Sequence, residues 1–476
     1  MAGITRYVTW TGGPAGDYIT DGSADQIEIN AALAWANANP GNVIKMRGTG
    51  DINTPHIYNI TGQVNFGSST VWCAEPGAKL FIPNGACGSS PSDCIFPDGK
   101  PVITQIPGTY PTDVEIYGFE IDGNCQNQST KLGYVGGDLK SAGSGVERLI
   151  GIYGSSDSSY HITNINIHDM VFHDAFGEAL LIRYGENIKF QYNSCSNHQH
   201  CGVFFKAVTG SGNEIHHNTI AGITSDCIRL DNCQNINVYK NTLTAYGGSN
   251  NNGAALYGHN GIQIANASRY STLTNNINVY DNTISGHNLC GIWINDALQK
   301  AGTASQNVHI HHNMFTDCGW ASWAPWASGI GIRWGNGIVI EKNTINGSYC
   351  EGILVYAKIT PSSTKVTVKN NNIINTLKNR AGASGYPSVL GYGIANTVSA
   401  YITVDATGNW TTGNASGDYH KVIPSSKATD YIEDAIPDGG TGKDEDDPVE
   451  PGKPDGIYVP GTTSIIDDEY IGVKRE

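Results

Sequence analysis

Side chains that can transfer protons or bind anions recur at matched places in a repeated phrase of this sequence. Each copy is a short apolar alternation that begins at a small residue, as in ALLIRY from Ala179, GVFFKA from Gly202, CIRLDN from Cys227 and GIQIAN from Gly261. If these copies are strands, the residue after the small one points inward and the next one points outward. The outward and strand-edge positions then hold Glu178, Arg183, His200, Phe204, Lys206, Asp226, Arg229, Asp231, His259, Gln263, Trp293, Asn295, Asp296, Arg333 and Trp334.

The carboxylates of this face predict glycoside hydrolysis. That reaction needs a protonated acid and a second carboxylate, about 6.5 to 9.5 Å apart for inversion and about 5 to 5.5 Å for retention. Glu178 and Asp226 would lie two coils apart, or ~9.6 Å at the usual strand spacing, which favours inversion. Asp231 is an alternative partner, with His259 orienting it or adjusting its pKa.

The cations and histidines of the same face also fit β-elimination on a uronate. A cation must neutralise the uronate, a base must take the C5 proton, and an acid must protonate the leaving oxygen. Lys206, Arg229 and His200 can fill those roles without a cofactor, or with a Ca²⁺ ion held by carboxylate and Asn oxygens. The purely structural explanation is an exposed ladder of ion pairs, each worth under ~1 kcal/mol.

Cationic and aromatic residues predict where a sugar chain binds. Only 15 % of the chain is charged, so charge gathered on one long shallow face suits an acidic polymer, and Arg with Lys suits its carboxylates. A polar-rimmed Trp platform can stack on sugar rings, although packing under a loop would also explain the Trp residues. The predicted binding residues are Arg183, Gln263, Trp293, Asn295, Trp323, Trp326, Arg333 and Trp334.

The sequence predicts no metal ligand. The pairs His216/His217 and His311/His312 fall at the same coil position, where stacked turn residues explain them better than zinc does, because no Cys or carboxylate completes a site. The eleven Cys form no CxxC pair and are expected to be mostly buried thiols.

A second phrase, Asn-x-x-Ile/Val-x-x-Asn-x-Ile, indicates the elements that position these residues. It returns as NEIHHNTI from Asn213 and NINVYKNTL from Asn235, 22 residues apart, and as NINVYDNTI from Asn276. Short strands at such a period bury a core only when they stack coil on coil, so we expect an all-β, right-handed single-stranded parallel β-helix. One Asn per coil should form a structural column at a turn: Asn193, Asn218, Asn241, Asn282, Asn313, Asn343 and Asn371.

The ends of the chain have other compositions. Residues 17–41 predict a capping helix whose Ile27, Ala31, Leu33 and Trp35 cover the open end of the core. We expect the β-helix to span 1–433, an acidic Pro/Gly linker 434–456 and a tail or domain stub 457–476. A net charge of -15 without a basic run argues against nucleic acid, and no apolar run is long enough to span a membrane.

The order DGSADQIEINAAL, VIKMRG, VEIYGFEIDGN and NINIHDMVFHDAFGEALLI resembles the pectin-lyase-like β-helix superfamily, and within it the disaggregatase-type proteins of methanogenic archaea. That resemblance implies depolymerisation of an acidic, chondroitin-like cell-surface polysaccharide. Ser225-Asp226-Cys227-Ile228 and Gly258-His259-Asn260-Gly261 are also similar to the Asp-Asp-Cys-Ile and Gly-His-Gly of polygalacturonase-type glycosidases. Ser225 departs from that pattern, as does HQHCG in the preceding coil, so that mechanism does not transfer whole.

These observations predict an extracellular, monomeric, endo-acting depolymerase of an acidic, uronate-containing polysaccharide, with hydrolysis favoured. A polysaccharide lyase is the alternative enzyme. A non-catalytic glycan-binding surface protein or tailspike-like adhesin is the alternative from another class.

Overall fold

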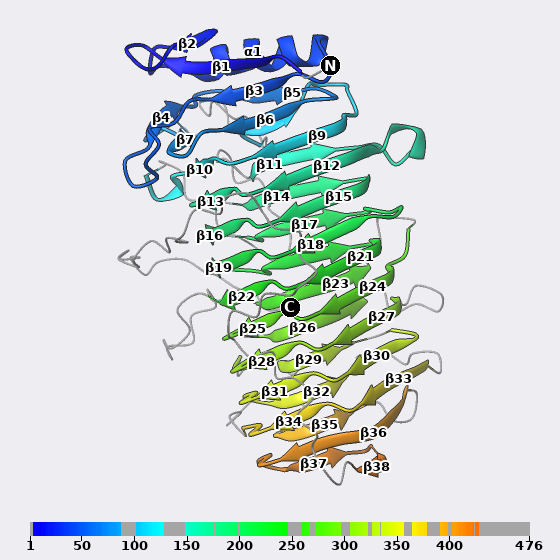
Figure 1. Cartoon of the computed structure of the whole chain (residues 1–476). Coiled ribbons are helices and arrows are strands. Elements are labelled where there is room, and N and C mark those ends of the chain that lie inside the picture. The colour runs from blue at the N-terminus through cyan, green and yellow to red at the C-terminus, as the bar shows by residue number, and fades with distance from the viewer. Residues whose placement is uncertain are drawn as a thin grey trace, which may run out of the picture.

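The chain folds into a parallel β-helix, as the repeats predict (Figure 1). The computed structural model describes residues 3–86, 101–127, 148–175, 177–198, 200–245, 259–266, 272–296, 305–321, 326–333, 335–356, 364–377, 391–397, 402–422 and 424–427. The expected linker 434–456 and tail 457–476 lie outside these residues and stay predictions. Each coil contributes one strand to each of three faces, here called A, B and C.

Face A runs the length of the molecule. Its strands are β1 (Thr5–Trp10) with β2 (Tyr18–Thr20) beside it, β3 (Val43–Met46), β6 (Val71–Ala74), β9 (Thr112–Tyr117), β12 (Ile162–His168), β15 (Gly185–Gln191), β18 (Asn213–His216), β21 (Gln234–Tyr239), β24 (Asn275–Tyr280), β27 (Gln306–His311), β30 (Ile338–Glu341), β33 (Thr364–Lys369), β36 (Ile402–Thr412) and β38 (Pro424–Lys427).

Face B follows face A in each coil. Its strands are β4 (His56–Asn59), β7 (Ala78–Phe81), β10 (Glu120–Asp122), β13 (Val171–His173), β16 (Ser194–His198), β19 (Thr219–Ile223), β22 (Thr242–Ala245), β25 (Thr283–Ser285), β28 (Met314–Thr316), β31 (Thr344–Asn346) and β34 (Asn372–Ile374). Strand β36 continues from face A into face B, where it pairs with β34.

Face C is a separate 12-stranded sheet and carries the predicted site. Its strands are β5 (Val64–Phe66), β8 (Ile103–Gln105), β11 (Arg148–Tyr153), β14 (Glu178–Arg183), β17 (Val203–Lys206), β20 (Ile228–Asp231), β23 (Asn260–Asn266), β26 (Cys290–Asp296), β29 (Ser328–Ile332), β32 (Glu351–Val355), β35 (Tyr392–Asn396) and β37 (Gly417–His420). Two short 3₁₀ turns, η1 (Cys125–Asn127) and η2 (Ser158–Tyr160), lie in loops.

Polar columns hold the coils in register. The predicted Asn column is confirmed: from Asn193 onward, each backbone N–H donates to the side-chain oxygen of the next Asn at 2.9 to 3.0 Å. Asn409 continues the column by one coil. Other corners need a left-handed backbone, which Asn adopts at little cost, as at Asn235, Asn276 and Asn307 with φ of 55°, 55° and 50°.

The N-terminal cap is confirmed, with corrections at two residues. Helix α1 (Gln26–Ala38) buries Ile29, Ala32, Leu33 and Ala36 against the first coils. Ile27 is 62 % exposed and Ala31 is also exposed, so the predicted roles of these two residues in covering the core are wrong. With the 3.6-residue period, the helix turns Ile29 and Leu33 toward the core and leaves Ile27 on the outer side.

Candidate active site on face C

The register of face C brings many of the predicted residues into two adjacent outward columns. The outward column runs Phe204, Arg229, Gln263 and Trp293 through β17, β20, β23 and β26. The next outward column, two residues later in each strand, runs Arg183, Lys206, Asp231 and Asn295, with Ala265 between the last two. The small residue at each strand start permits close approach of the backbone of the next coil.

Glu178 begins β14 as part of a buried charged triad. Its Oε2 forms an ion pair with Arg148 Nε at 3.0 Å, and its Oε1 lies 2.9 Å from His200 Nδ1. Burial opposes the charge of Glu178, which is 1 % exposed, but Arg148 and His200 outweigh it and hold the pKa of that carboxyl well below its usual range. Because an ionised carboxylate only accepts hydrogen bonds, His200 must carry its proton on Nδ1.

Asp226 lies two coils beyond Glu178, as predicted, directly before β20. Its Oδ1 accepts a hydrogen bond from Asn260 Nδ2 at 2.8 Å, and Arg229 lies 3.9 Å from its other oxygen. Arg229 is paired more closely with Asp231, by two contacts of 3.1 and 3.2 Å. Asp226 is therefore the carboxylate of this group with the weakest cationic partner.

His259 completes the cluster beside Asp226. Burial lowers the pKa of His259, with Asp226 opposing and His200 and Arg229 adding to the shift, so the ring is neutral at pH 7. The Phe204 ring supports two cations, Lys206 Nζ at 4.0 Å and the Arg229 guanidinium at 4.8 Å from its centroid. The cluster thus combines an ionised carboxylate, a weakly paired carboxyl, neutral imidazole and fixed cations.

Burial of this cluster overturns its explanation as an exposed ion-pair ladder. Glu178, Asp226 and Asp231 are each at most 1 % exposed, and His200 and Lys206 are also buried. These side chains therefore do not line an open, shallow groove. The side chains of Arg148 and Arg229 keep 14 % and 16 % of their surface, so the accessible rim of the cluster is cationic.

The predicted binding residues divide into two groups. Arg183 lies over the Tyr153 ring, and Gln263 accepts a hydrogen bond from Asn260. Farther along, Arg333 donates to Asn295 at 3.1 Å.

The aromatic residues among them are partly buried. Trp293 is buried against Trp326, at a centroid distance of 6.3 Å, and Tyr356 lies beyond Trp326. Trp323 and Trp334 lie outside the described residues. Trp326 is the described member of the predicted platform that keeps exposed surface, and all these binding roles stay predictions.

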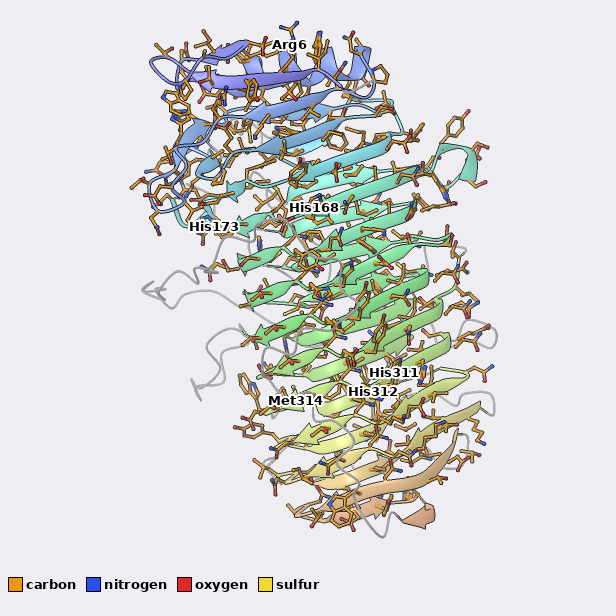
Figure 2. All side chains as sticks on the ribbon, in the orientation of Figure 1. Arg6, His168, His173, His311, His312 and Met314 are labelled. Carbon is orange, nitrogen blue, oxygen red and sulfur yellow. The ribbon has the colours of Figure 1, made fainter. Side chains whose placement is uncertain are left out.

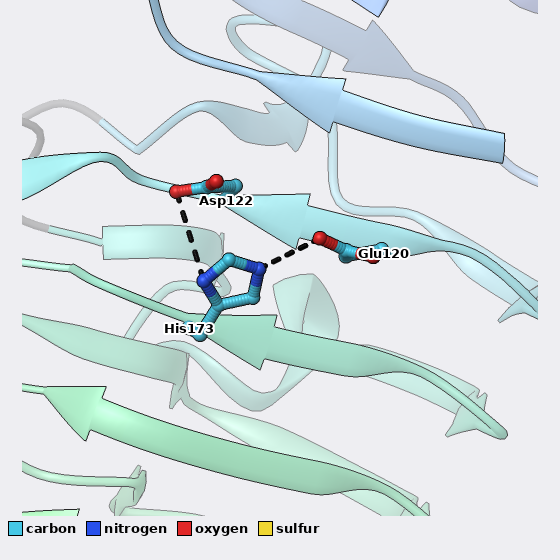
Figure 3. Close-up of side chains that lie close together, drawn as sticks. All are labelled: Glu120, Asp122 and His173. Carbon is cyan, nitrogen blue, oxygen red and sulfur yellow. Dashed lines mark hydrogen bonds and ion pairs between the residues drawn. The ribbon is translucent and has the colours of Figure 1, made fainter. Parts of the chain in front are cut away.

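Sequence reasoning missed Arg148 and a second charged cluster on face B (Figure 3). His173 Nε2 lies 2.8 Å from Glu120, and its Nδ1 lies 3.7 Å from Asp122. These three side chains could hold a metal ion, but Lys79 Nζ already lies 2.8 and 2.7 Å from the two carboxylates. Burial opposes the charge of His173, yet its carboxylate neighbours raise its pKa to about 9. Lys79 and protonated His173 therefore already balance the charge of Glu120 and Asp122.

The paired histidines lie on face A, not with the site. His311 and His312 are adjacent at the end of β27 (Figure 2), with their Nδ1 atoms 2.8 Å apart. His216 and His217 form the same contact at 2.7 Å. His216 and His311 share one column, joined by stacked Tyr239 and Tyr280, as the prediction of stacked turn residues requires.

The nine described cysteines are all free and buried, in agreement with the sequence.

Among the residues that the structure describes, no helix is long and apolar enough to cross a membrane.

Comparison with solved structures finds the same fold in proteins of low identity. The A-module of the Azotobacter vinelandii mannuronan C-5 epimerase AlgE6 is 14 % identical, with a TM-score of 0.55 over 86 % of this chain and 94 % of its own. An exopolygalacturonase from Thermotoga maritima is 9 % identical, with a TM-score of 0.53 over 82 % and 88 %. PfbA, a surface adhesin of Streptococcus pneumoniae, is 14 % identical, with a TM-score of 0.50 over 86 % and 92 %.

Comparison with family models gives two adjoining matches. Residues 146–277 match the family described as right handed beta helix region, and residues 274–435 match the one described as disaggregatase related. Among curated proteins, none matches significantly. Both matches agree with the right-handed parallel β-helix that the structure shows, and the second relates residues 274–435 to disaggregatases.

Proposed function

We propose that this protein is an extracellular, endo-acting depolymerase of an acidic polysaccharide, and that it cleaves by hydrolysis at the face C cluster. The observation that carries the proposal is the contrast between two buried carboxylates two coils apart. Glu178 is held ionised by Arg148, whereas Asp226 is held mainly by the neutral amide of Asn260. Two carboxyl groups with such different partners are suited to act as base and acid, and we propose Glu178 as the base and Asp226 as the acid.

With Asp226 as the acid and Glu178 as the base, every proton in an inverting hydrolysis has a donor and an acceptor. Asp226 gives its proton to the glycosidic oxygen as that bond breaks, and water attacks the anomeric carbon from the opposite side. Glu178 takes the proton of the water, directly or through His200. Two coils separate the carboxylates by ~9.6 Å, near the upper end of the range for inversion.

Cations support an acidic substrate. Arg148, Arg183, Lys206 and Arg229 gather on face C of a chain whose net charge is -15. An anionic polymer repelled by the rest of the surface would be attracted to this rim. The match to a disaggregatase-related family supports a role on polysaccharides, and the chondroitin-like polymer and the extracellular location are parts of the proposal.

Elimination is the second candidate because of one observation, the neutral His259 ring. A neutral imidazole near Arg229 can take the C5 proton of a uronate whose charge is balanced by Arg229 and by Lys206, the second cation over the Phe204 ring. Elimination leaves an unsaturated uronate that absorbs ultraviolet light, whereas hydrolysis does not.

The test is digestion of chondroitin and other uronate polymers, in which the release of reducing ends and the ultraviolet absorbance are both measured. We expect reducing ends without absorbance, and their loss in Asp226→Asn. The matched control is Asp405→Asn. Asp405 lies on the distant strand β36 and pairs with Lys365 of β33, so this change removes a carboxylate away from face C. Absorbance that rises with reducing ends would replace hydrolysis by elimination. Binding without turnover in the unchanged protein would make it an adhesin.

A further inference from the structure

Face A carries a set of polar side chains, mostly amides, on a different side of the coil from the charged cluster. Asn237, Asn278 and His309 occupy one outward column across β21, β24 and β27. All three side chains are partly exposed. Parallel pairing spaces these three positions by ~4.8 Å along the axis, one on each of three successive coils.

A second column of amides runs beside the first. Gln234, Asn275 and Gln306 begin the same three strands. Two hollows lie over these columns, one of about 530 Å³ reaching Gln234 and Gln306 and one of about 660 Å³ reaching Asn237, Asn278 and His309. The lining of both hollows includes no Asp, Glu, Lys or Arg among the described residues.

The structure accounts for Asn278, whose Oδ1 lies 3.0 Å from His311 Nε2, but not for Asn237. The neighbouring corner residues Asn235 and Asn276 have left-handed backbones and bond to each other at 3.0 Å, which explains their type. Asn237 is not at a corner, and its side chain forms no hydrogen bond with any described residue. Asn is depleted at such positions because β-branched and aromatic residues pack better there.

We propose that this amide array binds an uncharged, β-linked oligosaccharide chain along the axis of the β-helix, as a site separate from face C. The Asn237 amide offers an acceptor and two donors, and Asn278 adds the donors of its Nδ2, which can pair with neighbouring hydroxyl groups of a sugar. Such groups, evenly spaced along the axis, suit the flat ribbon of a β-linked chain. The inference does not depend on which reaction face C performs.

Charge around the array argues for an uncharged ligand. Glu214 precedes Asn237 in the same outward column, and Glu341 lies 2.7 Å from His309 at the other end. Each carboxylate has a cation nearby, Lys189 at 3.3 Å and Lys369 at 2.8 Å, so neither leaves an excess of positive charge for an anion. The cations Lys189 and Lys369 are therefore already paired.

The test is calorimetric titration of the full chain with cellohexaose and with chitohexaose. We expect at least one hexamer to bind, and the double variant Asn237→Val, Asn278→Val to bind about tenfold more weakly, since two amide partners are lost. The control is Asn166→Val. Asn166 lies in the same outward column, on β12, but does not line either hollow. Its affinity for the hexamer should not change.

Two results would overturn the proposal: neither hexamer binds at millimolar concentration, or the double variant binds as tightly as the unchanged protein. If the double variant does not fold, Asn237→Asp serves instead, and its added charge should still weaken binding. Asp226→Asn separates the two proposals, because it should abolish turnover of the acidic polymer and leave hexamer binding unchanged.

Discussion

The ion pair between Arg148 and Glu178 gives the sharpest quantitative test of the site. Arg148→Gln would leave the Glu178 carboxylate, 1 % exposed, without its cation at 3.0 Å. Breaking a buried pair by removing one partner costs about 3–5 kcal/mol. Glu178→Gln should cost less, about 1–3 kcal/mol, because Arg148 keeps some contact with water and Gln can still face His200.

A double-mutant cycle isolates the pair. The variant with both substitutions should be less destabilised than the sum of the single variants, by about 2 kcal/mol, since it holds no unpaired charge. Urea unfolding of the four proteins at pH 7, followed by Trp fluorescence, measures each free energy. The damage from Arg148→Gln should shrink as the pH falls toward 4, because Glu178 can then take a proton in that variant.

The matched control for this cycle is the exposed pair Lys189 and Glu214 on face A, 3.3 Å apart. Lys189→Gln should cost no more than ~1 kcal/mol, because water screens that pair. If the Arg148 and Glu178 effects add within about 0.5 kcal/mol, the two side chains do not act as a pair and the assignment of Glu178 as the fixed anion fails.

Three further predictions concern stability. Asn282→Ala should cost about 2–5 kcal/mol in urea unfolding, because it removes the acceptor of the Asn241 backbone N–H inside the core; a loss below ~1 kcal/mol would contradict the structural role of the column. His173 is protonated in the folded state up to a pKa of about 9, above its usual 6.5, so its stabilisation is complete below pH 6.5 and is lost as the pH rises through 9. The melting temperature should fall over that range, and less steeply in His173→Asn. His216 shows the opposite case, because burial and His217 lower its pKa to about 4. Folding stability should therefore fall as the pH drops from 6.5 to 4. If the melting temperature of His216→Gln does not fall over that range, His216 is the source of the loss.

Much of the fold follows from short-range pattern. The repeated Asn phrase and the alternation after each small residue predict the parallel coils, the Asn column and the alignment of Lys206 with Asp231, since each depends only on the period of two along a strand and on equal strand positions between coils. The cap helix was predicted by its composition, but the side facing the core depends on where the helix begins, which is why Ile27 was misplaced.

Pairing across insertions required the tertiary structure. Arg148 lies 30 residues before Glu178, with an insertion directly before its strand, so only the register of β11 with β14 shows that the two side chains meet. The same holds for Lys79 with Glu120, which are 41 residues apart.

The sequence by itself determined the β-helix and which residues share face C, because strand period and coil stacking are local rules. Only the tertiary structure decided that the three carboxylates are buried and that each has a different partner. The physical reason is that a carboxyl group's charge state depends on desolvation and on nearby charges within a few ångströms, and sequence spacing specifies neither.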